Sequence, residues 1–194
     1  MKKILLTIAL IAAAAFGANA QLRVEAGLNS GWYSFDDGMS TYDLTAGYGP
    51  KLAVYYTLCG NERAGVEAGL SFAQINAKNE TLKSKISVSN IQIPVRAFYA
   101  FALGNVSIVP GIGLYAGYGL GGKTTLADAV ENDPFEGPEG LKKFDLGIDD
   151  EILLGFGEHF TAGIGTQNSL FNLCKDKDVK TKSTSLFITV GWRF

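Results

Sequence analysis

Hydrophobic and polar residues alternate along most of this chain with a period of two. The last ten residues show the alternation most clearly, because one of their two faces carries only large apolar side chains. That face consists of Leu186, Ile188, Val190, Trp192 and Phe194, and the opposite face of Ser185, Phe187, Thr189, Gly191 and Arg193. Alternation over this length predicts a β-strand whose two faces meet different surroundings.

The same pattern recurs in eight segments, and the connections between them alternate in length. Three connections are tight, at 59–62, 103–105 and 157–158, whereas those at 35–45, 77–85, 122–142 and 172–182 are longer and polar. Short turns at one end and long loops at the other are typical of an up-and-down barrel. We therefore predict an all-β fold, an eight-stranded antiparallel up-and-down transmembrane β-barrel. Its strands are expected at about 21–34, 46–58, 63–76, 86–102, 106–121, 143–156, 159–171 and 183–194.

Alternation alone does not decide which face of the barrel meets solvent, because a secreted lipocalin-like barrel would turn its apolar face inward around a ligand. Strand length favours the membrane, since many segments have 12 or more residues and can cross about 30 Å of hydrocarbon at a tilt. The polar face is also rich in Gly, Ser, Thr and Asn and poor in Lys, unlike a soluble exterior. Aromatic residues gather near strand ends, as in two interfacial girdles: Trp32, Tyr48, Tyr118 and Phe171 at the loop end, and Tyr99, Phe101, Phe156, Phe160, Trp192 and Phe194 at the turn end.

Residues 1–20 have the pattern of a secretory signal peptide, with Lys2 and Lys3, a short apolar run and a small-x-small site ending at Ala20. Its removal would leave one barrel domain, residues 21–194. Loss of the two lysines lowers Lys+Arg from 17 to 15 against 19 Asp+Glu, a net charge of about −4. This balance gives no electrostatic basis for binding nucleic acid. Export and a lipid-facing barrel together predict the outer membrane of a Gram-negative cell.

If the apolar faces meet lipid, charged residues of both signs point into the lumen and can pair there. They are Arg23, Glu25, Glu67, Arg96, Asp145, Asp149, Glu151 and Arg193. A barrel of eight strands has room for little more than packed side chains, so we predict a filled interior without a wide pore. Glycines on the same face would relieve the crowding, at Gly111, Gly113, Gly117 and Gly119.

Two residues fit this arrangement poorly. Asp150 falls on the lipid-facing parity, and either a bulge near it or a slip toward the lumen would remove the conflict. Pro94 lies within a strand although it cannot donate a ladder hydrogen bond, so it predicts a bulge or a local break in pairing.

No catalytic, cofactor or metal site emerges from the remaining motifs. The single histidine, His159, lies beside Glu158 in a tight turn, and the acidic runs 36–37 and 149–151 lack calcium-loop spacing. Gly121-Gly122-Lys123-Thr124 superficially resembles a phosphate loop, but it follows a predicted strand with no helix behind it, so a phosphate site is rejected. Cys59 and Cys174 are expected at opposite barrel ends, too far apart for a disulfide.

Loop 126–142 is the most individual segment of the chain, and we expect it to form an acidic cap on the outside. It carries Asp128, Glu131, Asp133, Glu136 and Glu139. Contact with a protein or a cation is possible there, although solvation of the carboxylates explains them more simply.

Four short stretches, 49–56, 91–95, 143–147 and 190–194, resemble the PorT-like outer-membrane β-barrel proteins of Bacteroidota. The resemblance implies an eight-stranded barrel surrounded by outer-membrane lipid. It also implies that the assembly machinery recognises the C-terminal strand ending in Phe194. From residues and resemblance together we expect a non-enzymatic, monomeric protein that acts through its outer loops in a structural, adhesive or interaction role. A secreted lipocalin-like binding barrel and a lipid-modifying barrel enzyme are the alternatives.

Overall fold

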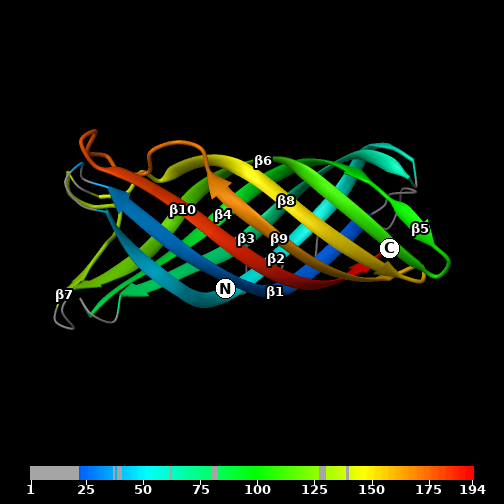
Figure 1. Ribbon diagram of the computed structural model, residues 1–194, viewed down its shortest axis with the longest axis horizontal. Coiled ribbons are helices and arrows are strands. Elements are labelled where there is room, and N and C mark those ends of the chain that lie inside the picture. The colour runs from blue at the N-terminus through cyan, green and yellow to red at the C-terminus, as the bar shows by residue number, and fades with distance from the viewer. Residues whose placement is uncertain are drawn as a thin grey trace.

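A computed structural model describes residues 22–36, 38, 41–61, 63–79, 83–126, 130–138 and 140–194 of the chain (Figure 1). The expected signal peptide and position 21 lie outside the described residues. Eight long strands form the wall, and two short strands, β5 (Phe101–Leu103) and β7 (Val130–Asn132), pair with one of them. The long strands are β1 (Leu22–Asp36), β2 (Thr41–Gly60), β3 (Ala64–Asn79), β4 (Ser84–Tyr99), β6 (Val106–Leu126), β8 (Phe144–Phe156), β9 (Phe160–Ser169) and β10 (Lys180–Arg193).

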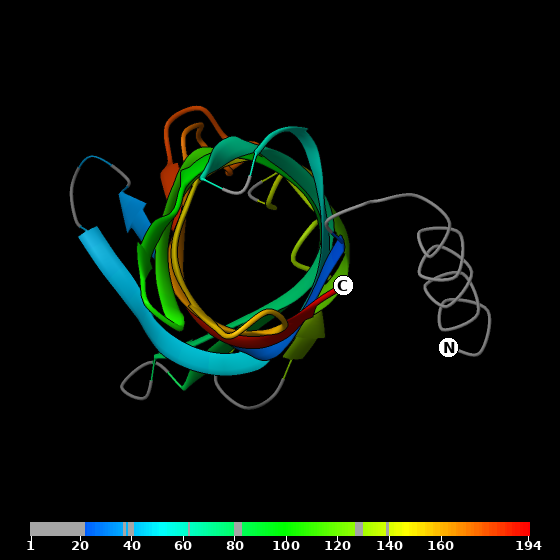
Figure 2. The same cartoon turned by 90° about the vertical axis from the view of Figure 1, so that its right-hand side faces the viewer.

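Every pairing between these strands is antiparallel, and the sheet closes on itself. Sequence neighbours pair around the wall, β1 pairs with β10, and β4 pairs with β6 across the short β5 hairpin. Seen along its axis, the chain forms a ring (Figure 2). The predicted all-β, eight-stranded antiparallel barrel is confirmed, and closure leaves no unpaired sheet edge along the described wall.

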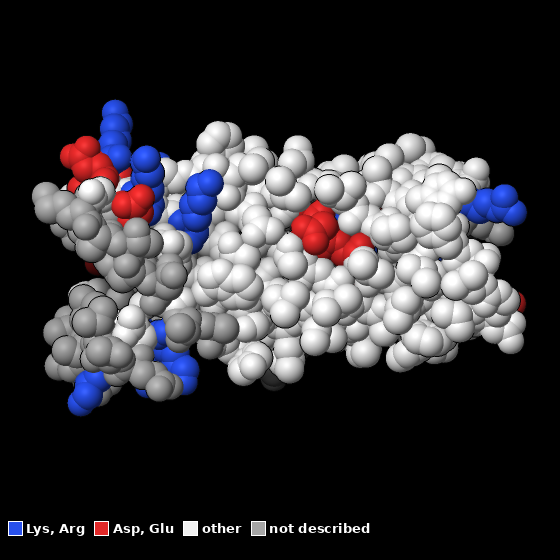
Figure 3. Space-filling model, in the orientation of Figure 1, with Lys and Arg blue, Asp and Glu red and all other residues white. Residues whose placement is uncertain are grey.

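The apolar faces of the strands point outward. On β10, Leu186, Ile188 and Val190 are 37%, 58% and 53% exposed, whereas Phe187 between them is fully buried in the lumen. A lipocalin-like barrel would show the reverse, so that alternative is wrong. The wall between the two ends is almost free of charged residues on the face in view, while lysines and acidic residues gather at the loop end, on the left (Figure 3).

Aromatic residues of the predicted girdles lie on this outer face. Those at the turn end are all exposed: Tyr99, Phe101, Phe156, Phe160, Trp192 and Phe194. At the loop end Tyr48, Tyr118 and Phe171 are exposed and Trp32 is half-buried, and Phe144 joins them. No helix among the described residues is long and apolar enough to cross a membrane.

The strand boundaries differ from the predicted ones mainly at the loop end. There β2 begins at Thr41 instead of 46, and β6 continues to Leu126 instead of 121, where it also pairs with β7. Because these stretches are polar, the sequence predicted loops there. In the structure their backbone N–H and C=O groups pair with a neighbouring strand, so the strands continue past the apolar part of the wall.

Pro94 and Asp150 have different outcomes. Opposite Pro94 and Ile93, two pairings between β3 and β4 are missing while the register on either side is unchanged, which confirms a local break. Asp150 lies in an unbroken register on both sides of β8, so the expected bulge or slip is wrong. Its carboxylate therefore stays on the outer face.

Candidate functional site

The lumen is the first candidate site, and its turn-end half is filled by paired charges. Inward parity on β1 brings in Arg23 and Glu25, whose side chains pair at 2.9 Å. The same guanidinium lies 2.8 Å from Glu67 on β3 and 3.6 Å from Glu151 on β8. Because these strands lie on different sides of the ring, the ion pairs cross the lumen and fill it.

Arg96 on β4 is the second cation of this network. Its guanidinium lies 2.8 Å from Glu67, 2.8 Å from Glu151 and 3.6 Å from Asp149. The ring of Tyr55 is shared by both arginines, with the guanidinium carbons of Arg23 and Arg96 at 4.7 and 4.3 Å from its centroid. Charges so far from water require such mutual compensation.

Two large lumenal residues, Lys51 and Tyr55, were missed by the sequence analysis, although their strand parity could have identified them. A third, Phe187, faces the lumen as the parity of its strand indicated. The Lys51 ammonium lies 3.5 Å from the centroid of the Phe187 ring, and both side chains are completely buried. A polar face was expected to hold small residues, but an inward aromatic ring can stabilise a buried cation.

The loop-end half of the lumen is apolar instead. Strand residues contribute one side of a buried cluster: Tyr33, Leu44, Ile75, Ala77, Ile86 and Val88. Loops contribute the other side, with Phe135 and Leu141 from the segment after β7 and Leu173 from the segment after β9. Seen along the barrel axis, part of the chain lies inside the ring of strands (Figure 2).

The expected acidic cap at 126–142 thus has buried residues as well as exposed ones. Asp128 and Glu139 lie outside the described residues, and the side chain of Glu131 is not described, so the acidic cap is only partly tested. Asp133 accepts a hydrogen bond from the Phe135 amide at 2.9 Å, and Glu136 is exposed. The loop is thus not simply an outer feature, because Phe135 and Leu141 close the barrel mouth from within.

Hydrogen bonds tie the two loops together as one cap, which we define as residues 133–138, 140–142 and 172–175. Lys175 Nζ donates to the Phe135 carbonyl oxygen at 2.6 Å, and the Lys142 amide donates to the Leu173 carbonyl at 2.6 Å. The Leu141 amide donates to the Pro134 carbonyl at 2.7 Å. These bonds satisfy backbone groups that the buried cap would otherwise leave unpaired.

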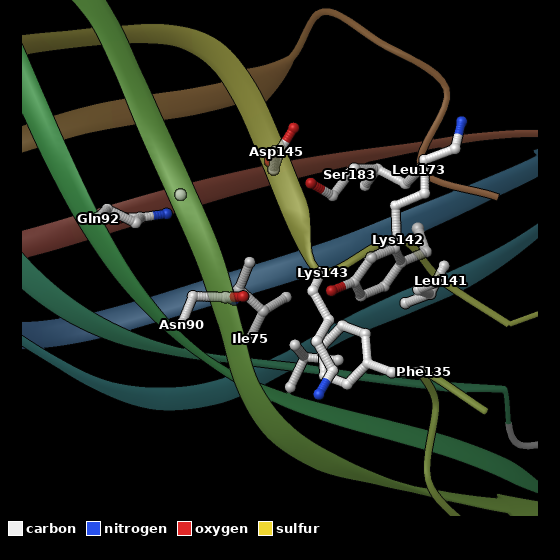
Figure 4. A pocket seen from close by; sticks show the side chains of 13 residues that line it. Ile75, Asn90, Gln92, Phe135, Leu141, Lys142, Lys143, Asp145, Leu173 and Ser183 are labelled. Atoms are coloured by element: carbon white, nitrogen blue, oxygen red, sulfur yellow. The ribbon is translucent and has the colours of Figure 1, made fainter. Parts of the chain in front are cut away.

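A cavity of about 20 Å³ remains between the cap and the polar middle of the lumen (Figure 4). Gln92, Asn90, Ser183 and Asp145 line it on the polar side, and Phe135 and Leu141 on the other. Tyr115 donates to Asp145 at 2.6 Å beside it. The volume suits one or two water molecules and is far below that of a small-molecule site.

The remaining predicted lumenal residues lie apart from the ion-pair network. Asp145 accepts a hydrogen bond from Tyr115, and Arg193 is half-buried at the turn end.

Cys59 is exposed at the turn end and Cys174 is buried at the loop end, so the predicted lack of a disulfide between them is confirmed. The four glycines named above face inward, as expected.

Metal-ligating side chains do not gather among the described residues. No group of three or more metal-ligating side chains occurs in that part of the chain. His159 stacks on Trp192 with ring centroids 5.0 Å apart, and its Nδ1 lies 2.9 Å from the Arg193 carbonyl oxygen. Its contacts are those of a surface turn, with no nucleophile among them.

Comparison with known proteins agrees with this architecture. The family profile described as "Outer membrane protein beta-barrel domain" matches residues 4–194. No curated protein matches the sequence.

Several solved structures share the fold. Neisserial surface protein A is similar with a TM-score of 0.56 and 13% identity, over 91% of this chain and all of that one. A major outer membrane protein from Thermus thermophilus has a TM-score of 0.50 and 16% identity, over 91% and 100% of the two chains. The outer membrane enzyme PagL has a TM-score of 0.50 and 12% identity, over 86% and 97%. At these identities the likeness concerns the fold alone.

Proposed function

The chain belongs to the outer membrane protein beta-barrel domain family and lies in the outer membrane, and from that premise we propose that it is a non-enzymatic, non-conducting barrel that makes its contacts through the loop-end cap. The narrower relation to PorT-like barrels of Bacteroidota, recognition of Phe194 by the assembly machinery and cleavage after residue 20 belong to the same proposal.

The observation that carries the proposal is the filling of the lumen at two levels. Ion pairs cross the turn-end half, and the buried side chains of the cap fill the loop-end half. A lumen filled in this way leaves no path for solutes. Function then falls to the outer surface, and the cap is the part of that surface where two loops are joined by hydrogen bonds.

Exposed residues of the cap and of the loop beside it offer the contact surface. Glu136, Gly137 and Pro138 are exposed on one loop, and Lys177 and Asp178 on the other. Both signs of charge occur within this small area. Polar loops held by a rigid barrel are a usual place for binding.

Exchange of these exposed residues tests the proposal in cells that lack the native chain. In the cap variant, residues 136–138 and 177–178 become Gly and Ser, while Phe135, Leu141 and Leu173 are kept. In the control variant, exposed turn-end residues Asn61, Asn105 and Glu158 are changed instead. Surface adhesion and cell aggregation are measured, with heat-modifiable gel mobility as the check on folding.

We expect the wild type and the turn-end variant to restore adhesion, and the cap variant to fold and yet fail. Full restoration by the cap variant would contradict the proposal. A measured turnover of outer-membrane lipid by the purified chain would favour the lipid-modifying enzyme instead.

A further inference from the structure

One acidic side chain lies in the middle of the lipid-facing wall, away from the lumen and the cap. Asp150 is half-buried on the outer face of β8, between the exposed Ile152 and the half-buried Ile148. Figure 3 shows a red acidic patch midway along the wall, over the position of β8 in Figure 1, with uncharged atoms around it.

The depth of Asp150 follows from its own strand. Phe144 and Phe156 are exposed at the two ends of β8, and Asp150 is six residues from each. A rise of about 3.3 Å per residue and a tilt of about 40° place it roughly 15 Å from either aromatic ring along the membrane normal. That is the centre of a hydrocarbon layer of about 30 Å.

Two polar residues on β9 accompany the carboxylate. Thr166 Oγ1 donates to Asp150 Oδ1 at 2.8 Å, and Asn168 Nδ2 donates to Thr166 Oγ1 at 3.0 Å. Thr184 on β10 is paired with Asn168 and continues the polar row toward the loop end. We call Asp150, Thr166, Asn168 and Thr184 the polar row.

These hydrogen bonds do not use all the donors and acceptors of the row, and lipid cannot supply partners for the rest. They occupy one carboxylate oxygen and one of the two Asn168 amide hydrogens, and no other side-chain bond to these groups occurs in the described strands. Hydrocarbon chains offer neither donors nor acceptors, and polar side chains within the membrane therefore seek protein partners.

We propose that the polar row is the contact through which two copies of this chain associate side by side within the membrane. The row carries both an acceptor, the second carboxylate oxygen of Asp150, and a donor, the second amide hydrogen of Asn168, so it is complementary to itself. Two copies inserted in the same direction can be related by a two-fold axis along the membrane normal, which keeps every residue at its own depth.

With that axis between β8 and β9, Asp150 of each copy faces the Thr166–Asn168 pair of the other. Ile112, Ile152 and Ile164 surround the row and supply flat, branched surface for packing. The association would replace the monomer expected from the sequence. It is independent of the cap, because β8 and β9 present the row on the side wall.

Cysteine cross-linking of the refolded mature chain in phosphatidylcholine vesicles tests the contact. Ile152→Cys places a thiol beside the row, in a Cys59→Ser background where the native Cys174 is buried at the loop end. The matched control is Leu52→Cys on β2, also exposed, and three strands or more from β8 in either direction around the ring.

We expect cross-linked dimer from Ile152→Cys and little from Leu52→Cys. Adding Asp150→Leu should lower the dimer fraction at least about fivefold, since the two-fold axis removes the contact twice. Adding Asn168→Leu should act in the same direction. Both substitutions place an apolar residue against lipid, so heat-modifiable mobility should show folded barrels.

The proposal is overturned if no dimer forms at any lipid ratio, if both thiol positions cross-link equally, or if Asp150→Leu leaves the dimer unchanged. A purified chain that stays monomeric in vesicles, yet cross-links in cells to a different membrane protein through Ile152→Cys, would also overturn it. That result would assign the row to another partner.

Discussion

The two halves of the lumen are filled by opposite chemistry. Toward the turn end, Arg23 and Arg96 pair with carboxylates from β1, β3 and β8. Toward the loop end, Phe135 and Leu141 enter from a loop and pack on apolar strand residues. The first half is built by the wall alone, whereas the second requires a segment from outside the wall. The lumen of an eight-stranded barrel can thus be filled at two levels, by electrostatic pairing in one half and by hydrophobic packing in the other.

The largest expected effect comes from breaking the charged half. Arg96→Met would leave Glu67, Asp149 and Glu151 with less compensation in a closed space, and removal of one partner of a buried pair costs about 3–5 kcal/mol. We expect a loss of that size in the free energy of unfolding, measured by urea titration in lipid vesicles. Arg63→Met, at an exposed turn, is the control and should change it by less than about 0.5 kcal/mol. Equal effects would show that the network does not hold the wall.

The apolar half should respond differently, because the cap can open while the wall stays intact. Phe135→Ala removes a buried ring, a change that costs about 3–5 kcal/mol in a core. We expect the loss in the closure of the cap, seen as faster trypsin cleavage after Lys142, with urea unfolding of the barrel nearly unchanged. Phe171→Ala, at an exposed ring, is the control. Unchanged cleavage would mean that Phe135 does not hold the cap.

A smaller effect should follow from filling the space that Phe135 occupies. A Cβ at Gly119 would overlap the Phe135 ring, whereas one at Gly121 would meet nothing within 4 Å. Overpacking costs about 1–3 kcal/mol, and less where the obstructed ring belongs to a movable loop. Gly119→Ala should therefore raise the trypsin cleavage rate by less than Phe135→Ala does, and Gly121→Ala should leave it unchanged. Equal rates for the two glycine variants would place the ring elsewhere.

The same contrast shows what could be predicted from sequence. A period of two assigned Arg23, Glu67, Arg96 and Glu151 to the lumen, because parity along a strand decides the face. It did not place Phe135, since a loop has no period and its insertion depends on the space above Gly117 and Gly119. The five acidic residues of loop 126–142 favoured an outer position, and that inference missed the single aromatic ring among them.

Asp150 shows where strand parity and the energetic cost of a charge in lipid give opposite predictions. Its parity was read correctly, but the cost of a charge in lipid argued for a bulge that does not occur. The hydrogen bond from Thr166, which itself accepts one from Asn168, lowers that cost locally. The alternation placed Asp150 in lipid, and the cost of a charge there argued against that position. The polar residues that resolve this conflict lie on another strand, so the sequence around Asp150 could not reveal them.

Ion conductance of the purified mature chain in planar bilayers tests most directly the claim that the lumen is closed at two levels. We expect no stable open-channel current for the wild type or for Phe135→Ala, because the ion pairs of Arg23 and Arg96 still cross the turn-end half. Currents are expected only when Phe135→Ala is combined with Arg96→Met. A steady open-channel current through the wild-type protein would contradict that claim.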